Sequence, residues 1–146
     1  MSKWARPEDE SAYIISEESA EKMVREVLDF YEIDPSRSDS AQEKILEESL
    51  DKLQKAYRRG ALENKLDDTK GFCIVQHLKN GTTLTYREMK GKDRVVMDGF
   101  DNTVAFTRTY AILGRLCGYG EDAIAKLSGR DWETAGTIAL VFFMNA

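Results

Sequence analysis

The sequence predicts an α+β fold, and three observations lead to this prediction. Apolar residues recur at helical spacing over residues 16–59, the period changes to two over residues 61–87, and helical spacing returns after residue 101. We therefore expect an N-terminal helical hairpin and a small antiparallel sheet of two to three strands with an Asn-Gly hairpin. A C-terminal part with three helices, residues 101–146, completes the chain.

The 146 residues are expected to form a single domain, residues 1–146, in which residues 1–15 are a loose polar arm. A chain of this length buries roughly 70% of the surface that its unfolded form exposes. Its start lacks the apolar core of a signal peptide, and its longest apolar run, residues 138–144, falls short of the about 20 residues that cross a bilayer. We expect a soluble, cytoplasmic protein with no membrane partner.

The cysteine content and the distribution of charge exclude further classes of protein. The two cysteines lie far apart without CxxC spacing, and there is a single histidine, so we expect no disulfide framework, no zinc site and no cofactor. Residues 1–56 hold 8 Lys and Arg against 15 Asp and Glu, a net charge of −7, and residues 57–146 hold 13 against 11, a net charge of +2. Nucleic-acid binding needs a concentrated basic face, so nucleic acid is not the expected partner.

The helical hairpin, residues 16–59, has clear end signals. Ser16 is placed to cap the first helix, and acidic residues follow it in the first turn. This helix should stop near Ile33, because Pro35 disfavours helical geometry in the residue before it. Ser40 opens a capping box at the start of the second helix, and Gly60 can take the left-handed conformation that ends it.

The β-meander, residues 61–87, should have strands over residues 61–66, 72–78 and 82–87. Asn80-Gly81 is the sequence expected of a two-residue type I′ turn between the last two strands. That turn would place His77 opposite Leu84 and Val75 opposite Tyr86. The core face of the sheet would then carry Cys73, Val75, His77, Leu84 and Tyr86.

A loop over residues 88–99 should precede the C-terminal part, with one turn of helix or a short strand at residues 95–97. A helix starting at Asp101 or Asn102 follows and closes at Gly118. Its predicted apolar face carries Phe106, Tyr110, Leu113 and Cys117. A short helix with Ala123, Ile124 and Leu127 comes next, and Asp131 begins the last helix.

The last helix is apolar on nearly every side from Trp132 to Met144. A helix of this kind must be enclosed, either by its own fold or by a partner. The first alternative is a buried core helix. The second is a partner-binding surface, because a large exposed apolar patch usually marks an interface, and its candidate residues are Trp132, Ile138, Val141, Phe142 and Phe143.

Three other groups of residues are weaker candidates for a functional site. Cys73 and His77 are a nucleophile and base by type, but four residues along a strand separate them by about 13 Å, too far for a hydrogen bond, so both are expected to be structural. A basic cluster around the predicted hairpin is interpreted as a solvated loop, and it consists of Lys79, Arg87, Lys90, Lys92 and Arg94. Acidic residues at helical spacing lack the pattern of a calcium loop, so no metal is expected, and these are Glu17, Glu18, Glu21, Glu47 and Glu48.

The second half of the chain, residues 84–146, resembles the tail assembly chaperones of Mu-like and other long-tailed phages. The resemblance rests on LTYREMKGKDR, LGRLCGYGEDAIAKL and SGRDWETAGTIALVFF. In that family a strand leads to an Arg-containing turn with a nearby Asp, a helix, a small helix, an Asp-capped turn and a final apolar helix. The residues that fall on this pattern are Arg87, Asp93, Leu116, Gly118, Ile124, Leu127 and Asp131. The acidic hairpin of residues 1–70 departs from the family pattern.

The resemblance implies a non-enzymatic protein from a phage or prophage. It would bind the tape measure protein, a long coiled-coil-like partner, and help to recruit tail tube subunits in the bacterial cytoplasm. The alternative is a small cytoplasmic interaction module that homodimerises through its apolar last helix. A small hydrolase or transferase is the third reading, and Cys73 with His77 would be its only nucleophile and base.

Overall fold

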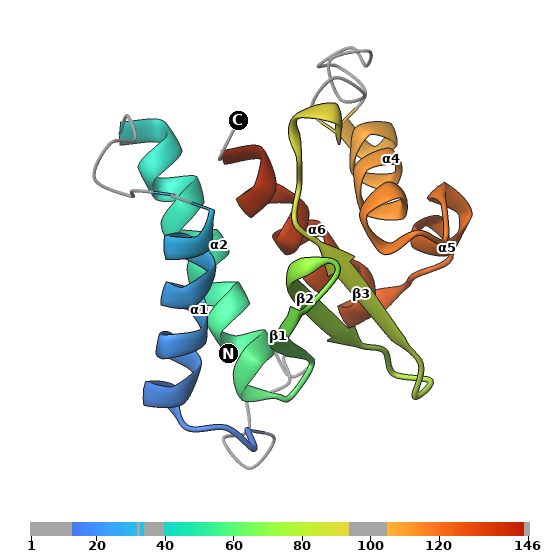
Figure 1. Cartoon of the computed structure of the whole chain (residues 1–146). Helices are drawn as coiled ribbons and strands as arrows, with labels where there is room; N and C mark the ends of the chain where they lie inside the picture. The colour runs from blue at the N-terminus through green and yellow to red at the C-terminus, as the bar shows by residue number, and fades with distance from the viewer. Residues whose placement is uncertain (1–12, 32, 34–39, 94–104, 145–146) are drawn as a thin grey trace, which may run out of the picture.

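The computed structural model describes residues 13–31, 33, 40–93 and 105–144, and within the helices it does not describe the side chains of residues 40–42, 105–108 and 142–144. In chain order its elements are α1 (Glu17–Phe30), α2 (Ser40–Arg58), β1 (Leu62–Asp67), β2 (Gly71–His77), β3 (Thr83–Arg87), α4 (Ala105–Cys117), α5 (Glu121–Ala125) and α6 (Gly129–Met144). The predicted α+β class is confirmed. Figure 1 shows α1 and α2 on one side, α4 and α5 on the other, and the sheet and α6 between them.

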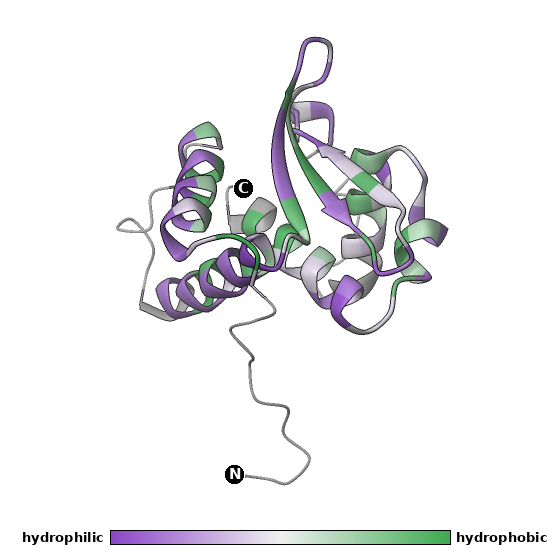
Figure 2. Cartoon of the chain, turned by 90° about the horizontal axis from the view of Figure 1, so that it is seen from below, coloured by the Kyte–Doolittle hydropathy of each residue, from purple (hydrophilic) through white to green (hydrophobic). Residues whose placement is uncertain are grey.

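The helix ends follow from the signals in the sequence. Ser16 caps α1, because its hydroxyl oxygen accepts a hydrogen bond from the backbone nitrogen of Ser19 at 3.1 Å. The helix ends at Phe30, three residues before Ile33. Gly60 has a φ of +76° just after α2, as predicted for a left-handed cap. Both helices are amphipathic, and hydrophilic and hydrophobic stretches alternate along them in Figure 2.

The end of the predicted loose arm is held in place. The backbone nitrogens of Ile14 and Ile15 donate to the carbonyl oxygen of Arg58 at 2.8 and 3.0 Å. The Arg58 guanidinium lies 4.1 Å from the centre of the Tyr13 ring. Residues 13–15 are therefore fixed to the end of α2, and the prediction of a loose arm was wrong for them. Residues 1–12 of that prediction lie outside the described residues.

The sheet has the strand order β1-β2-β3, with both pairs antiparallel. The predicted register between β2 and β3 was wrong by one residue, because Gln76 faces Leu84 and Val75 faces Thr85. The loop has three residues, since Leu78 pairs with Thr82 and Gly81, at a φ of +91°, donates to the carbonyl of Leu78. This is the geometry of a type I turn followed by a left-handed glycine.

Asn80 explains why the longer loop forms. Its side-chain oxygen accepts hydrogen bonds from the backbone nitrogen of Thr82 at 3.0 Å and from the Thr82 hydroxyl at 2.6 Å. These bonds hold the chain in an Asx turn. In this loop the glycine Gly81 takes the left-handed conformation, whereas a type I′ turn needs two residues with positive φ.

The one-residue change in register moves side chains between the two faces of the sheet. The face toward the main core carries Leu62, Phe72, Ile74, Leu84 and Tyr86. Leu84 and Tyr86 were predicted for it correctly, whereas Cys73, Val75 and His77 lie on the opposite face. Cys73 and Val75 are nevertheless buried, because β2 is the central strand, and His77 is exposed.

Buried polar side chains join the sheet to the helices. Tyr57 of α2 donates through its hydroxyl to the side-chain oxygen of Asn64, and the Asn64 amide donates to the carbonyl of Met23 at 3.0 Å. At the other end, the Gln76 amide donates to the carbonyl of Asp131 at 2.9 Å, and its oxygen accepts from the Tyr86 hydroxyl at 2.8 Å. The sheet therefore holds α1 and α2 at β1, and the start of α6 at β2.

Replacing Gln76 by Met is expected to lower the free energy of unfolding by about 2 kcal/mol, because it leaves the buried Tyr86 hydroxyl without its acceptor and removes the hydrogen bond to the Asp131 carbonyl. Urea denaturation followed by circular dichroism measures this change. The double variant Gln76→Met/Tyr86→Phe should recover part of the loss, since it also removes the orphaned hydroxyl. A single Met variant as stable as the wild type would contradict this role.

The C-terminal helices pack around α6. The buried face of α4 is formed by Ile112, Leu113 and Leu116, while Tyr110 and Cys117 of the predicted face are half-buried. Leu113 of the predicted face therefore lies in the core, Tyr110 and Cys117 pack against the core, and the side chain of Phe106 lies outside the described residues. Ile124 of α5 is fully buried. Residues 91–93 form one helical turn before α4, and the predicted short strand at residues 95–97 lies outside the described residues.

Candidate interaction site

The apolar face of α6 is directed mainly into its own fold. Ala135, Ile138, Ala139 and Val141 are each 1% exposed or less, and α6 packs against both α2 and α4. This matches the core-helix alternative for these positions. Deleting α6 would therefore remove a large part of the hydrophobic core, and not only a docking surface.

The predicted partner-binding residues differ in accessibility. Ile138 and Val141 are buried and cannot touch a partner while the fold is intact. Trp132 is half-buried, with its ring centre 5.2 Å from that of Tyr110 on α4. The side chains of Phe142 and Phe143 lie outside the described residues. Partner binding through these positions stays a prediction.

Two apolar side chains remain accessible on the helices that meet here. Leu140 of α6 is 42% exposed, and Ile45 of α2 is 45% exposed. In Figure 1 the end of α6 lies beside the beginning of α2, and the two helices are in contact. Leu140 and Ile45 are thus exposed apolar positions on two helices that are in contact, and we call the two positions together the α2–α6 surface.

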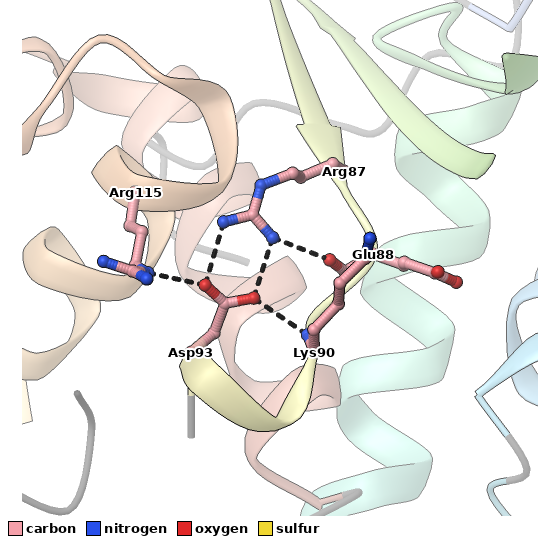
Figure 3. A network of polar contacts seen from close by, with 5 residues as sticks. All are labelled: Arg87, Glu88, Lys90, Asp93 and Arg115. Atoms are coloured by element: carbon pink, nitrogen blue, oxygen red, sulfur yellow. Dashed lines mark hydrogen bonds and ion pairs between the residues drawn. The ribbon is translucent and has the colours of Figure 1, made fainter. Parts of the chain in front are cut away.

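The most concentrated electrostatic feature is a buried carboxylate between two arginines (Figure 3). Asp93 is completely buried, and its two oxygens accept hydrogen bonds from the Arg87 guanidinium at 2.7 and 2.8 Å. The Asp93 carboxylate also accepts from Nε of Arg115 at 2.5 Å and from the backbone nitrogen of Lys90 at 2.8 Å. The network ties the end of β3 to α4 across residues 88–93.

This geometry explains the ionisation of the network. The hydrogen bonds from Arg87, followed by those from the Lys90 backbone and Arg115, hold the pKa of Asp93 far below its usual value, against the opposing effect of burial. The pKa of Arg87 is raised, chiefly by its hydrogen bonds to Asp93. A bidentate guanidinium–carboxylate pair of this kind is directional and fixes the angle between the two segments.

The basic cluster is divided by the fold. Arg87 points inward to Asp93, and Lys90 contributes its backbone nitrogen to the same carboxylate. Lys79 lies in the turn before β3, whereas Arg87 is the last residue of that strand, and the Lys79 backbone nitrogen donates to the Asp131 carboxylate at 3.2 Å. Arg94 lies outside the described residues. Arg87 is therefore structural, and it does not join Lys79 in one solvent-exposed patch.

Cys73 and His77 do not form a reactive pair in this fold. Cys73 is fully buried, and burial raises the pKa of its thiol, which disfavours the nucleophilic thiolate. His77 contacts the Glu63 carboxylate through Nε2 at 3.1 Å on the exposed side of the sheet. Both residues stay on the same face of β2, four positions apart, as the sequence suggested.

The acidic residues considered for metal binding stay on helix surfaces. Glu17, Glu18, Glu47 and Glu48 are exposed, and Glu21 pairs with Arg25 at 2.8 Å. In the part of the chain that the structure describes, no three His, Cys, Asp or Glu side chains come together as metal ligands. Across the same residues, no helix has the length and apolar character needed to span a membrane.

A groove of about 1360 Å³ lies between the end of α2, the β2–β3 turn and the start of α6. Its charged lining has both signs, with Arg59, Lys79, Lys126 and Arg130 against Asp131 and Glu133. The hydrogen bond from the Lys79 backbone to Asp131 joins the turn to α6 here. The groove therefore presents no single-sign surface for a charged ligand.

The sequence did not reveal two structural polar groups. Gln76 was not among the residues predicted for the core face of the sheet, although a glutamine within an apolar strand is itself a signal for a buried hydrogen-bonding role. Arg115 was not singled out, because its partner Asp93 is 22 residues away and only the tertiary fold brings them together. Arg87 was named in the basic cluster, which was interpreted as a solvated loop, and it was named together with Asp93 only through the resemblance.

The chain was compared with protein-family models, with curated proteins and with solved structures, and none of them matches it.

Proposed function

We propose that this protein is a non-enzymatic assembly chaperone of the phage tail type, which binds a tape-measure-like coiled-coil protein and assists tail tube assembly. The observation that carries the proposal is the order of elements over residues 83–144. The strand β3 ends at Arg87, which pairs with Asp93, and α4, the small helix α5 and the apolar helix α6 follow. This is the order that the resemblance implies.

The residues of the pattern support this proposal in detail. Leu116 is buried near the end of α4, and Gly118, at a φ of +80°, breaks the chain after it. Ile124 anchors α5 in the core, and Asp131 lies in the first turn of α6. These four residues of the pattern thus help to position the C-terminal helices that would present a binding surface.

The α2–α6 surface is the part of the molecule that we assign to the partner. An amphipathic helix of a coiled-coil protein would lay its apolar stripe over Leu140 and Ile45. The exposed Glu48 of α2 lies three residues after Ile45, on the same side of the helix, and would meet a basic side chain at the edge of that stripe. This surface is accessible without opening the core.

Replacing Leu140 by Glu is expected to reduce capture of the coiled-coil partner by about tenfold, roughly 1.4 kcal/mol of binding free energy. A charge would then face the apolar stripe, while the core beneath stays intact because Leu140 is 42% exposed. The measurement is a coexpression pull-down with the longest coiled-coil-rich protein encoded just downstream.

The matched control is Tyr119→Glu, because Tyr119 is 69% exposed and lies in the turn between α4 and α5, away from the α2–α6 surface. It should bind as the wild type does, and circular dichroism should show both variants folded. Equal capture by the Leu140 and Tyr119 variants would refute the assignment of this surface. Failure of the wild type to bind or solubilise the partner would refute the chaperone proposal itself.

The alternative, homodimerisation through the last helix, uses the same exposed position. It predicts that the wild type is a dimer by light scattering without any partner, and that Leu140→Glu makes it a monomer. A dimer that survives this substitution would exclude the last helix as the contact.

A further inference from the structure

The strand β1 is an open edge of the sheet. It pairs with β2 on one side only. The nitrogen of His77 donates to the carbonyl of Ala61 at 2.8 Å, so the odd-numbered residues of this segment direct their backbone groups to β2. The backbone N–H and C=O groups of Leu62, Asn64 and Leu66 therefore point away from β2. Within the described chain, none of these groups has a backbone hydrogen-bond partner on that side.

The outer half of this edge is accessible, and its one apolar side chain is that of Leu66. Leu66 is 77% exposed and lies directly across from Phe72 on the core-facing side of the sheet. The ring of Phe72 stacks on Phe30, with 4.6 Å between the centres, and Phe30 is 40% exposed. Leu62, at the inner end, is 1% exposed. An incoming strand thus has access to residues 64–67 and not to Leu62.

We propose that two copies of this chain dimerise through their β1 edges, as antiparallel strands centred on Leu66. In this register Leu66 of one copy faces Leu66 of the other, and each Lys65 faces the Asp67 carboxylate of its partner. The contact is isologous, as a two-fold dimer requires. It is separate from the α2–α6 surface and does not depend on the function proposed above.

Charge and burial exclude the neighbouring registers. Centring the pair on Lys65 would place two lysines directly opposite each other, which is destabilising. Centring it on Asn64 would pair Glu63 with Lys65 favourably, but it would also require Leu62 to accept a strand, and Leu62 is buried. The Leu66-centred register is the one that combines opposite charges with an accessible edge.

The dimer would join two three-stranded sheets into one six-stranded sheet. Its apolar part would unite Leu66, Phe72 and Phe30 of each copy, because residues that face each other across antiparallel strands lie on the same side of the sheet. The paired segment is short, so the association should depend on protein concentration.

Disulfide trapping tests the register directly. In a Cys117→Ser background, Leu66→Cys places two thiols on facing residues whose Cα atoms are about 5.5 Å apart, within the range of a disulfide. The matched control is Tyr119→Cys, which is exposed to a similar extent. With oxidised glutathione, the Leu66 variant should form a covalent dimer while the Tyr119 variant stays monomeric. Equal dimer formation by both, or none by the Leu66 variant, would overturn the proposal.

Sedimentation equilibrium supplies an independent measurement without cysteines. Leu66→Lys should raise the dimer dissociation constant by about tenfold or more, since it places two charges in the apolar centre of the contact. Lys65→Asp should act in the same direction by facing Asp67 of the second copy. Leu140→Glu should leave this equilibrium unchanged. A wild type that stays monomeric up to millimolar concentration, or a dimer that Leu66→Lys leaves intact, would refute the edge contact.

Discussion

Replacing Asp93 by Asn is expected to lower the free energy of unfolding at neutral pH by about 3 kcal/mol. The substitution keeps the shape of the side chain but removes the charge that holds two guanidinium groups. Arg87 and Arg115 would then face each other without the carboxylate between them. Their side chains are 23% and 38% exposed, so water relieves part of this cost. Urea denaturation followed by circular dichroism gives the value.

The pH dependence of the free energy of unfolding shows whether the ionised Asp93 carboxylate causes the loss of stability. The folded-state pKa of Asp93 lies far below its unfolded value of about 3.9, so its stabilising effect is complete above that pH and is lost as the pH falls below it. The stability difference between the wild type and Asp93→Asn should therefore shrink between pH 5 and pH 2.5.

The variant comparison isolates Asp93 from other acidic groups. Hydrogen bonds from the backbones of Lys70 and Thr69 lower the pKa of Asp67 to about 2, so this carboxylate titrates in the same acidic range. Because Asp67 is present in both proteins, its contribution cancels in the difference. A difference that stays constant down to pH 2.5 would show that the ionised Asp93 carboxylate is not what stabilises the fold.

Replacing Gly114 by Ala is expected to cost about 3 kcal/mol, the second large effect. A Cβ atom at this position would lie 2.5 Å from the carbonyl oxygen of Gly120 and 2.7 Å from the nitrogen of Glu121. Both are backbone atoms, which cannot rotate away as a side chain does. The nitrogen of Gly120 also donates to the Gly114 carbonyl at 3.1 Å, so α4 and the start of α5 would have to separate.

Gly136 on α6 is the matched control for Gly114. It also lies within a helix, but a Cβ atom there would meet nothing within 4 Å. Gly136→Ala should therefore raise stability by about 0.5–1 kcal/mol, since alanine loses less backbone freedom on folding. Thermal denaturation of the two variants should shift the midpoint in opposite directions. A Gly114→Ala variant with an unchanged midpoint would contradict the close backbone approach.

The sequence alone determined the class of the fold and most of its elements. Ser16 and Gly60 signalled helix ends by local chemistry, a side-chain cap and a left-handed glycine, and both appear where they were predicted. The change of hydrophobic period located the strands to within a residue or two. These features depend on interactions between near neighbours, so the sequence is sufficient to predict them.

The tertiary structure decided the register, the burial and the accessible surface. Asn80-Gly81 fits both a two-residue and a three-residue loop, and the bonds from Thr82 to Asn80 select the longer one. The apolar pattern of α6 is the same for a core helix and for a docking helix, and only the packing of α2 and α4 leaves Leu140 outside and Ile138 inside.

The buried Asp93 network was likewise beyond the sequence. An aspartate between two basic residues in a charged loop is usually solvated, and its partner Arg115 is distant along the chain. Local patterns determine which elements form because they depend on residues within a few positions of one another. Pairs of distant residues, and the faces that they cover, depend on how those elements pack, and that only the tertiary structure determines.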